Sequence, residues 1–401
     1  MRRTDPLLVI GALTVSLTSF SIIFWIAGMS PGHGMDLNAY RIGAELLHTE
    51  YGLYAADKQL WAQLEAETGL SPVTGPYRYP IHLAWLLTAL KGASTETLWA
   101  ANALLNWLAA TFGAALVARA LGGGILYPLS ILLVGASGSL AETILLGQVS
   151  GYIFCFLCLA ATSLQSSRMW PFAISVACGT ALKVLPVILI PIAVATRRWR
   201  IATVGSLATF ALFLLPVMVF GPEHLVQYFS GLTNILSLPG MGLNDQSIKA
   251  SFFSLGINDG VANIVRLILL ALLAYRLMQS LFSADAAVNV IGLTALGIAA
   301  SLLIPSTVFF TYHLYSIIPF LFVVDRLSRN RFCYLAGFLV VSYLLVQMAF
   351  FLPQILLRVS PTLISPDTGA FDWLGVLPVC YAFILFCAAF FFCSPRARLA
   401  F

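Results

Sequence analysis

An acidic residue just beyond the first apolar run is the clearest candidate for proton-transfer chemistry. Asp36 stands in the segment Gly34-Met-Asp-Leu-Asn-Ala-Tyr40, which follows that run directly. A carboxylate that is partly removed from water becomes a stronger base and can take a proton from a hydroxyl group. The alternative is structural, because an Asp that precedes a helix often caps it, and residues 37–48 are expected to form a helix. The local sequence leaves both interpretations of Asp36 open.

A lysine inside an apolar run is the second candidate. Lys183 lies in the segment Ala-Leu-Lys-Val-Leu-Pro, within a run over 170–195 that Gly179, Pro186 and Pro191 also interrupt. A charged side chain is costly within a membrane, so it is expected to face a cavity or a partner. An ammonium group in such a place is suited to neutralising a phosphate.

Four further polar segments supply possible binding groups. The candidates in them are Arg78, Tyr79, Gln148, Asn244, Gln246, Tyr312 and His313. Each has a structural alternative. Arg78 and Tyr79 are of the types that anchor a protein at a membrane interface, Asn244 and Gln246 suit a solvated turn, and His313 suits a hydrogen-bonded core position.

No metal site is expected. Cys155-Phe-Leu-Cys158 has a spacing found in zinc sites, but no second pair or nearby histidine completes it. The polar loops also contain no Asp-X-Asp pair, a common arrangement for holding a divalent cation.

The elements that position these residues are expected to be transmembrane helices. Of 401 residues, 60% are hydrophobic and 9% are charged, whereas soluble domains carry about 25% charged residues. Apolar runs of the roughly 20 residues needed to cross a bilayer recur along the whole chain. We therefore expect an all-α, polytopic helix bundle of about 11–13 membrane segments, forming a single integral membrane domain over residues 1–401.

Some spans are clearer than others. The clear ones cover roughly 7–28, 97–120, 147–166, 201–220, 261–283, 287–304, 307–324, 332–352 and 373–393. Regions 80–92, 125–140 and 170–195 are apolar but short or interrupted, and such breaks are tolerated at membrane depth where protein or a cavity satisfies the backbone.

Basic clusters predict the orientation. The net charge is +5, and arginines flank the spans near residues 2–3, 197–200, 326–331 and 396–398. Positive residues next to spans are retained in the cytoplasm, which places loops 29–79 and 221–260 outside. These basic clusters are too short and too widely separated for nucleic-acid binding.

The candidate residues then gather on the outer face, and a broken helix would bring Lys183 to them. One carboxylate with several cations and amides above a membrane cavity suits transfer of a group from an anionic lipid.

At these residues the sequence resembles glycosyltransferase family 87, of the GT-C superfamily of polyprenol-dependent membrane enzymes. The resemblance is carried, in order along the chain, by Asp36-Leu-Asn-Ala-Tyr40, Gly52-Leu-Tyr54, Tyr77-Arg-Tyr-Pro80, Gly147-Gln-Val149, Lys183-Val-Leu-Pro186, Asn244-Asp-Gln-Ser247 and Tyr312-His313. The chain departs from the family pattern at Ile81, Ser150 and Asp245.

The resemblance implies an inverting transferase that takes a sugar, usually mannose, from a polyprenyl-phosphate donor. The acceptor would be a glycolipid or glycan hydroxyl at the outer face of the plasma (inner) membrane, as in the mannosyltransferases of phosphatidylinositol mannoside synthesis. No cofactor is implied beyond the lipid-linked donor, and the partners are the two substrates and membrane lipids. Asp36 would be the catalytic base.

The other candidates would bind the substrates. Lys183, His313 and Arg78 are expected to bind the donor phosphate. The expected substrate-binding residues are Tyr79, Gln148, Asn244, Gln246 and Tyr312.

Two other functions fit parts of the pattern. A secondary transporter or a flippase for lipid-linked sugars also uses broken helices and buried charges, although inverted-repeat transporters show such breaks in both halves. A non-catalytic assembly subunit would leave Asp36 and Lys183 without a role.

Overall fold

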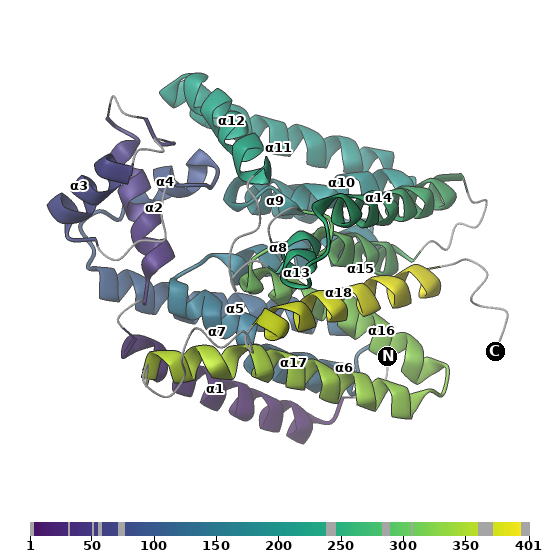
Figure 1. Ribbon diagram of the computed structural model, residues 1–401. Coiled ribbons are helices and arrows are strands. Elements are labelled where there is room, and N and C mark those ends of the chain that lie inside the picture. The colour runs from purple at the N-terminus through teal and green to yellow at the C-terminus, as the bar shows by residue number, and fades with distance from the viewer. Residues whose placement is uncertain are drawn as a thin grey trace.

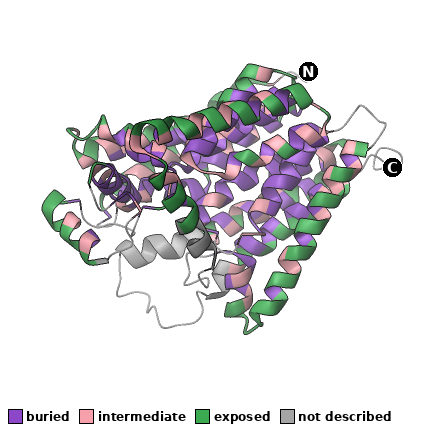
Figure 2. Cartoon of the chain, turned by 90° about the horizontal axis from the view of Figure 1, so that it is seen from above, coloured by how far each residue is buried: buried purple, intermediate pink, exposed green. Residues whose placement is uncertain are grey.

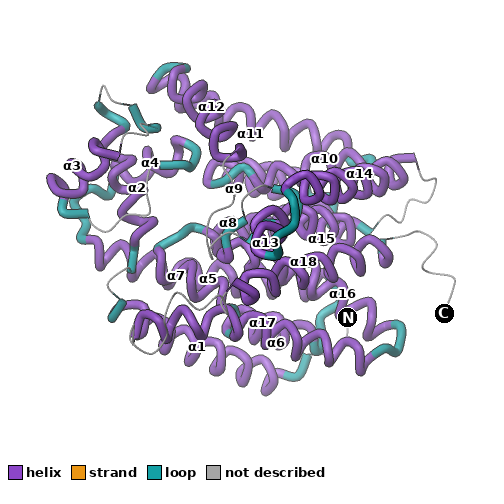
Figure 3. The backbone as a smooth tube through the Cα atoms, viewed as in Figure 1, coloured by secondary structure: helices purple, strands orange, loops and turns teal. Residues whose placement is uncertain are grey.

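Long apolar helices run through the molecule, and no strand is present among the described residues (Figures 1 and 3). The computed structural model describes residues 4–30, 33–49, 52–54, 58–70, 77–237, 246–282, 289–305, 308–359 and 372–393. The all-α membrane bundle that the composition predicts is thereby confirmed.

Within the part of the chain that the structure describes, four helices are each long and apolar enough to cross a membrane. They are α1 (Pro6–Gly28), α5 (Thr95–Ala120), α11 (Trp199–Phe220) and α14 (Asp259–Phe282). Large apolar side chains cover their outward faces, such as Leu7 on α1 and Phe210 and Met218 on α11, all exposed. Apolar surface this extensive is stable only when lipid covers it.

A bent pair and several shorter helices complete the apolar part of the bundle. In the pair, α6 (Leu126–Gly135) and α7 (Gly138–Leu146) meet at 45°. The shorter helices are α8 (Ser150–Gln165), α9 (Met169–Leu182), α10 (Leu189–Ala195), α15 (Val290–Ser301) and α16 (Ile317–Arg329). Towards the end of the chain follow α17 (Cys333–Val359) and α18 (Asp372–Phe392). The number of membrane crossings stays a prediction.

The inner helices form the core. Every residue of α15 from Val290 to Ala300 is buried, and Figure 2 shows buried residues concentrated in the middle of the bundle. Small residues allow the close approach: a Cβ added to Gly113 of α5 would lie 3.1 Å from the Cα of Cys155 on α8. Close backbone packing through small residues is typical of helices in membranes.

The expected loops contain helices of their own. Region 29–79 folds into α2 (Met35–Leu46) and α3 (Lys58–Thr68), and region 221–260 into α12 (Glu223–Ser237) and α13 (Ile248–Ser254). Figure 1 shows α2, α3 and α4 (Ile81–Thr88), with α12 above them, at one end of the bundle, and the end of α18 at the other. Pro80 is the N-cap of α4 rather than a first-turn residue, because its ψ of 147° is extended.

Two of the expected spans are interrupted. The run over 170–195 consists of α9, the short 3-10 helix η1 (Leu185–Ile188) and α10, with Lys183 at the break. The span expected over 307–324 begins with a second 3-10 helix, η2 (Phe310–Ser316), and continues as α16. Both interruptions lie where candidate site residues are found.

Candidate active site

Asp36 lies in the first turn of α2 and does not cap it. The N-cap is Gly34, at φ +74°, which has no side chain with which to cap the helix. Asp36 is 6% exposed. Its carboxylate sits at the positive end of the helix dipole, which stabilises negative charge. The capping interpretation of Asp36 is therefore wrong.

The end of α7 holds the start of α2 in place. The Gly34 N–H donates to the Leu145 carbonyl at 2.8 Å. At Gly147, which has φ +74°, an added Cβ would lie 2.8 Å from the Cβ of Leu37. Only glycine combines that backbone conformation with so close an approach, so the Gly147-Gln148 turn fixes the position of the residues around Asp36.

Lys183 lies where a proline ends α9. Pro186 would clash with the carbonyl of Leu182, four residues earlier, so the helix stops there. Lys183 takes an extended conformation (φ −161°, ψ 135°). Its Nζ is buried and has no hydrogen-bond partner among the described residues. The ammonium group instead lies 3.5 Å from the ring centroid of Tyr312 and 5.3 Å from that of Tyr79.

Asp36 and Lys183 belong to one cluster lined by tyrosines. The charge of Asp36 interacts electrostatically with Lys183, Tyr79 and Tyr312. The rings of Tyr40 and Tyr79 pack edge to face, with centroids 4.7 Å apart. The cluster draws on α2, the segment before α4, the break after α9, and η2, so four separate parts of the chain build it.

The tyrosines nearest Asp36 supply hydroxyl donors rather than bases. Burial raises the pKa of Tyr40 well above its ordinary value, and the neighbouring Tyr79 and Asp36 raise it further. Burial, followed by the charge of Asp36, likewise raises the pKa of Tyr79. Both phenols therefore keep their protons at neutral pH, and Asp36 is the acid–base group among the three.

Gln148 links the α7–α8 turn to η2. Its Oε1 accepts hydrogen bonds from Thr311 Oγ1 at 2.9 Å and from Ser150 Oγ at 3.2 Å. From α5, Asn106 donates to the Gln148 carbonyl (2.9 Å) and accepts from the Gly151 N–H (2.8 Å). These bonds fix η2, which carries Tyr312, relative to the α7–α8 turn. The same turn contacts the start of α2, which carries Asp36. Contact of Gln148 with substrate stays a prediction.

The structure places the other candidates less centrally. Gln246 is fully buried, and its backbone N–H donates to the Val308 carbonyl at 2.6 Å. Its side-chain carboxamide has no hydrogen-bond partner among the described residues.

His313 is buried against Phe310. Successive side chains on a 3-10 helix point about 120° apart, so His313 points away from its neighbour Tyr312. Arg78 is exposed. Asn244 lies outside the described residues.

Sequence reasoning did not single out two tyrosines near the cluster, Tyr54 and Tyr228, and it did not predict the helix α12 that carries Tyr228. Tyr54 donates from its hydroxyl to the Tyr79 carbonyl at 3.0 Å, and Tyr228, on α12, packs against Tyr54 with ring centroids 5.6 Å apart. Tyr54 stands in one of the quoted motifs, which could have singled it out. Tyr228 carried no such signal, because the segment around it reads as a polar loop.

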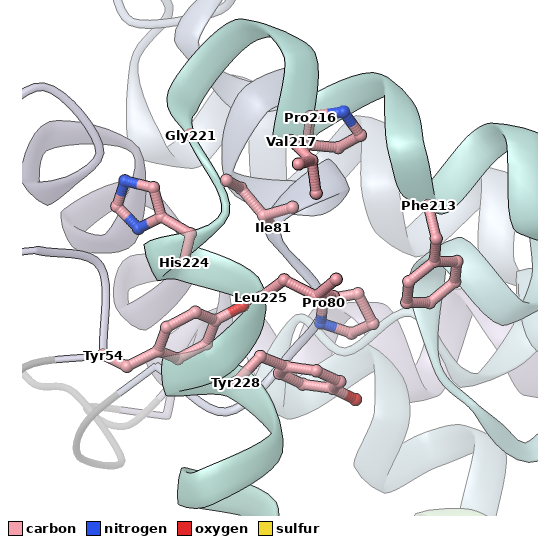
Figure 4. Close-up of a pocket in the computed structure, with 10 residues that line it drawn as sticks. All are labelled: Tyr54, Pro80, Ile81, Phe213, Pro216, Val217, Gly221, His224, Leu225 and Tyr228. Atoms are coloured by element: carbon pink, nitrogen blue, oxygen red, sulfur yellow. The ribbon is translucent and has the colours of Figure 1, made fainter.

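An apolar pocket adjoins the cluster. Figure 4 shows its walls, which come from α11, α12 and the start of α4, with Tyr54 and Tyr228 on one side. Asp36 and Lys183 do not line it. The pocket and the polar cluster are therefore neighbouring compartments.

One comparison with known proteins is informative. The model of glycosyltransferase family 87 matches residues 77–306. No curated protein and no solved structure matches the chain. The matched region includes Tyr79, Gln148 and Lys183, while Asp36 precedes it and Tyr312 follows it.

Proposed function

Because the chain belongs to glycosyltransferase family 87, we propose that it transfers a sugar, mannose in the first instance, from a polyprenyl phosphate to a hydroxyl group of a glycolipid or glycan. Family membership confirms the resemblance inferred from the motifs and makes the protein a membrane glycosyltransferase. The donor, the sugar, the acceptor and the outer face of the plasma membrane are parts of the proposal.

One observation carries the proposal: a buried carboxylate and a buried ammonium group share a single tyrosine-lined cluster. In the proposed reaction the Asp36 carboxylate takes the proton of the acceptor hydroxyl. The hydroxyl oxygen forms a bond to the anomeric carbon, and the bond from that carbon to the phosphate oxygen breaks. The polyprenyl phosphate leaves with the electron pair, and Lys183 stabilises its added charge.

Attack opposite to the leaving group inverts the anomeric centre. A single displacement of this kind needs one base on the acceptor side and one cation on the phosphate side. In our proposal Asp36 and Lys183, which interact within one cluster, take these two roles. The fixed geometry contributes to the rate as well, because positioned reactants avoid an entropic cost.

The test is transfer by purified protein. Wild-type protein in liposomes, given polyprenyl-phosphate mannose and a glycolipid acceptor, is expected to form a new glycoside. Asp36→Asn is expected to lower turnover roughly a hundred- to ten-thousand-fold, the usual contribution of a positioned base. Yield and Tm are expected to change little, because asparagine keeps the size of aspartate and most of its capacity for hydrogen bonds.

The matched control is Glu45→Gln on the same helix. Glu45 forms an exposed ion pair with Lys91 at 2.7 Å, so its loss is expected to leave turnover unchanged. Retention of more than about a tenth of the activity by Asp36→Asn would rule out Asp36 as the base. Glu142, a buried carboxylate on α7, would then be the next candidate. Movement of the lipid across the membrane without product would favour a flippase.

A further inference from the structure

A second group of polar side chains surrounds the start of α15. This helix packs against α14, α16 and α18. Arg276 comes from α14, Arg326 from α16, and Cys393 directly follows α18. Arg326 belongs to one of the arginine clusters expected in the cytoplasm, so this group of residues is expected at the membrane face opposite to Asp36.

Cys393 shows how closely these side chains gather. Its Sγ would lie 2.8 Å from a Cβ added at Gly292, in the first turn of α15, and the Cγ of Asn289 would lie 3.1 Å from the same Cβ. The charges of Arg276 and Arg326 both act on the Cys393 thiol. Arg276, Asn289 and Arg326 therefore surround one point, and we call these three residues the α15 cluster.

Asn289 caps α15 with one side-chain atom and leaves the other unused. Its Oδ1 accepts a hydrogen bond from the Gly292 N–H at 3.1 Å. Its Nδ2 is buried and has no hydrogen-bond partner among the described residues. The start of a helix is also the positive end of its dipole and attracts anions. A spare donor at this position suits a negatively charged ligand.

Arg276 likewise has a donor without an acceptor. Its guanidinium carbon lies 4.0 Å from the ring centroid of Phe390 on α18, and its Nη1 donates to Gln279 Oε1 at 2.6 Å. Its Nε is buried without a hydrogen-bond partner, and no carboxylate of the described residues forms a salt bridge with it. Asp325 of α16 pairs with Arg329 instead, at 2.8 Å. The guanidinium group is therefore fixed in place, and the described residues leave its charge without a counter-ion.

The α15 cluster lies beside a face of the protein that lipid is expected to cover. Its three residues are each half-buried. Tyr275 and Met278, which flank Arg276 on α14, are both exposed, and apolar side chains exposed on a membrane helix face lipid. Basic groups between membrane helices on the cytoplasmic side are typical binding sites for lipid head groups.

We propose that the α15 cluster binds the phosphate group of an anionic membrane phospholipid. The phosphate oxygens accept hydrogen bonds from Arg276 and Asn289, whose spare donors lack an acceptor. The charge of Arg326 and the positive end of α15 add electrostatic attraction. The lipid chains then lie along the exposed apolar side chains of α14, which a free phosphate ion could not use. This site is separate from the polar cluster around Asp36 and does not depend on the proposed function.

Asn289→Asp tests the inference while keeping the cap. Aspartate caps a helix as well as asparagine does, but its carboxylate would lie beside two guanidinium groups and take the place of the phosphate. The Kd of the purified full-length protein for phosphatidylglycerol, measured in detergent by native mass spectrometry, is expected to rise roughly tenfold or more, because a charge-assisted hydrogen bond is lost. The Tm without added lipid is expected to stay the same or rise, because an acid at a helix start is favourable.

Asn258→Asp is the matched control. Asn258 is exposed, and its Oδ1 accepts a hydrogen bond from the Gly260 N–H at 2.6 Å. It precedes α14, at the end of that helix away from Arg276. The substitution adds the same charge in a similar local setting, so the Kd for phosphatidylglycerol should stay within about twofold of the wild-type value.

Arg276→Gln provides a second variant. It removes the guanidinium group and is expected to raise the Kd for phosphatidylglycerol by a similar factor. Arg200→Gln removes the same charge from an exposed position near the start of α11 and should leave this Kd within about twofold. If the two arginine variants behave alike, the attraction is a property of the whole basic face, and the inference is overturned.

Other ligands and one further substitution complete the test. Phosphatidylcholine and inorganic phosphate are both expected to bind more weakly than phosphatidylglycerol. Inorganic phosphate that binds as tightly would mean that the ligand is a free anion, and an unchanged Kd in Asn289→Asp would mean that the α15 cluster binds no lipid. Asp285 lies outside the described residues, and tighter lipid binding by Asp285→Asn would mean that the chain supplies its own counter-charge. Each of these three results overturns the inference.

Discussion

At the scale of single residues, Lys183 holds a charge where charge is costly. Its ammonium group has two aromatic rings beside it and no hydrogen-bond partner among the described residues. A cation over an aromatic ring recovers about 2 kcal/mol or more when desolvated, and the charge of Asp36 in the same cluster also favours the ammonium form. Neither interaction supplies the hydrogen bonds that the ammonium group lacks, and the oxygens of a bound phosphate would supply them.

Lys183→Met is therefore expected to separate function from stability. The KM for the donor should rise at least about tenfold, because a hydrogen bond to a charged group contributes about 1.5–3 kcal/mol. The Tm should change little, because the desolvation cost of the ammonium group is removed while the buried Asp36 loses a favourable charge interaction. Donor-dependent kinetics and thermal unfolding in detergent measure both effects.

Lys91→Met is the matched control for Lys183. Lys91 is 37% exposed on its side chain and pairs with Glu45 at the surface, where ion pairs contribute about 0–1 kcal/mol. It should change neither KM nor Tm appreciably. If Lys183→Met lowers the Tm while donor kinetics stay normal, Lys183 is a structural residue.

At the scale of elements, the site depends on the contact between α7 and α2. Gly147→Ala places a methyl group 2.8 Å from the Cβ of Leu37 and forces a side chain into a φ of +74°. We expect a loss of about 1–3 kcal/mol of stability from overpacking. We also expect a loss of turnover at temperatures where the protein remains folded, because the first turn of α2 carries Asp36.

Gly11→Ala on α1 is the control for this substitution. An added Cβ at Gly11 has nothing within 4 Å, and alanine favours a helix over glycine by about 1 kcal/mol. It should leave Tm and turnover unchanged or slightly raised. Full turnover in a destabilised Gly147→Ala would show that the α7–α2 contact does not position Asp36.

At the scale of the whole molecule, α2 and α4, which flank the polar cluster, lie at the end of the bundle opposite the end of α18. The helices α2, α3 and α4 stand at that end, with α12 beside them (Figure 1). Arg198, which ties α11 to the end of α8 through Ser167 at 2.6 Å, marks one of the basic clusters expected in the cytoplasm. The end of the bundle that holds the polar cluster should therefore face the outside of the cell.

Cysteine labelling tests this orientation. In a cysteine-free background, Ala66→Cys on α3 and Gln227→Cys on α12, both exposed, are expected to react with an impermeant thiol reagent in intact cells. Ser166→Cys, exposed near Arg198, is expected to react only after the cells are opened. Labelling of just one of the first two positions would refute a shared outer face.

The sequence alone determined the class of the protein and singled out several of the residues that the polar cluster brings together. Apolar runs with few charges predict a membrane helix bundle, because the length needed to cross a bilayer is a property of each segment by itself. Lys183 was recognisable for the same reason, since the cost of a charge in an apolar run does not depend on the rest of the fold. The motifs around Asp36, Tyr79 and Tyr312 likewise indicated the family.

Only the tertiary structure decided how these residues meet. Asp36 could be a cap or part of a site until Gly34 proved to be the N-cap, held by a carbonyl from α7. Local pattern did not reveal that the rings of Tyr79 and Tyr312 lie beside Lys183, or that Tyr228 of an expected loop completes a pocket wall. Such contacts join residues far apart in the chain, and they depend on how whole helices pack. Periodicity and composition describe each segment alone and carry no information about which segment becomes its neighbour.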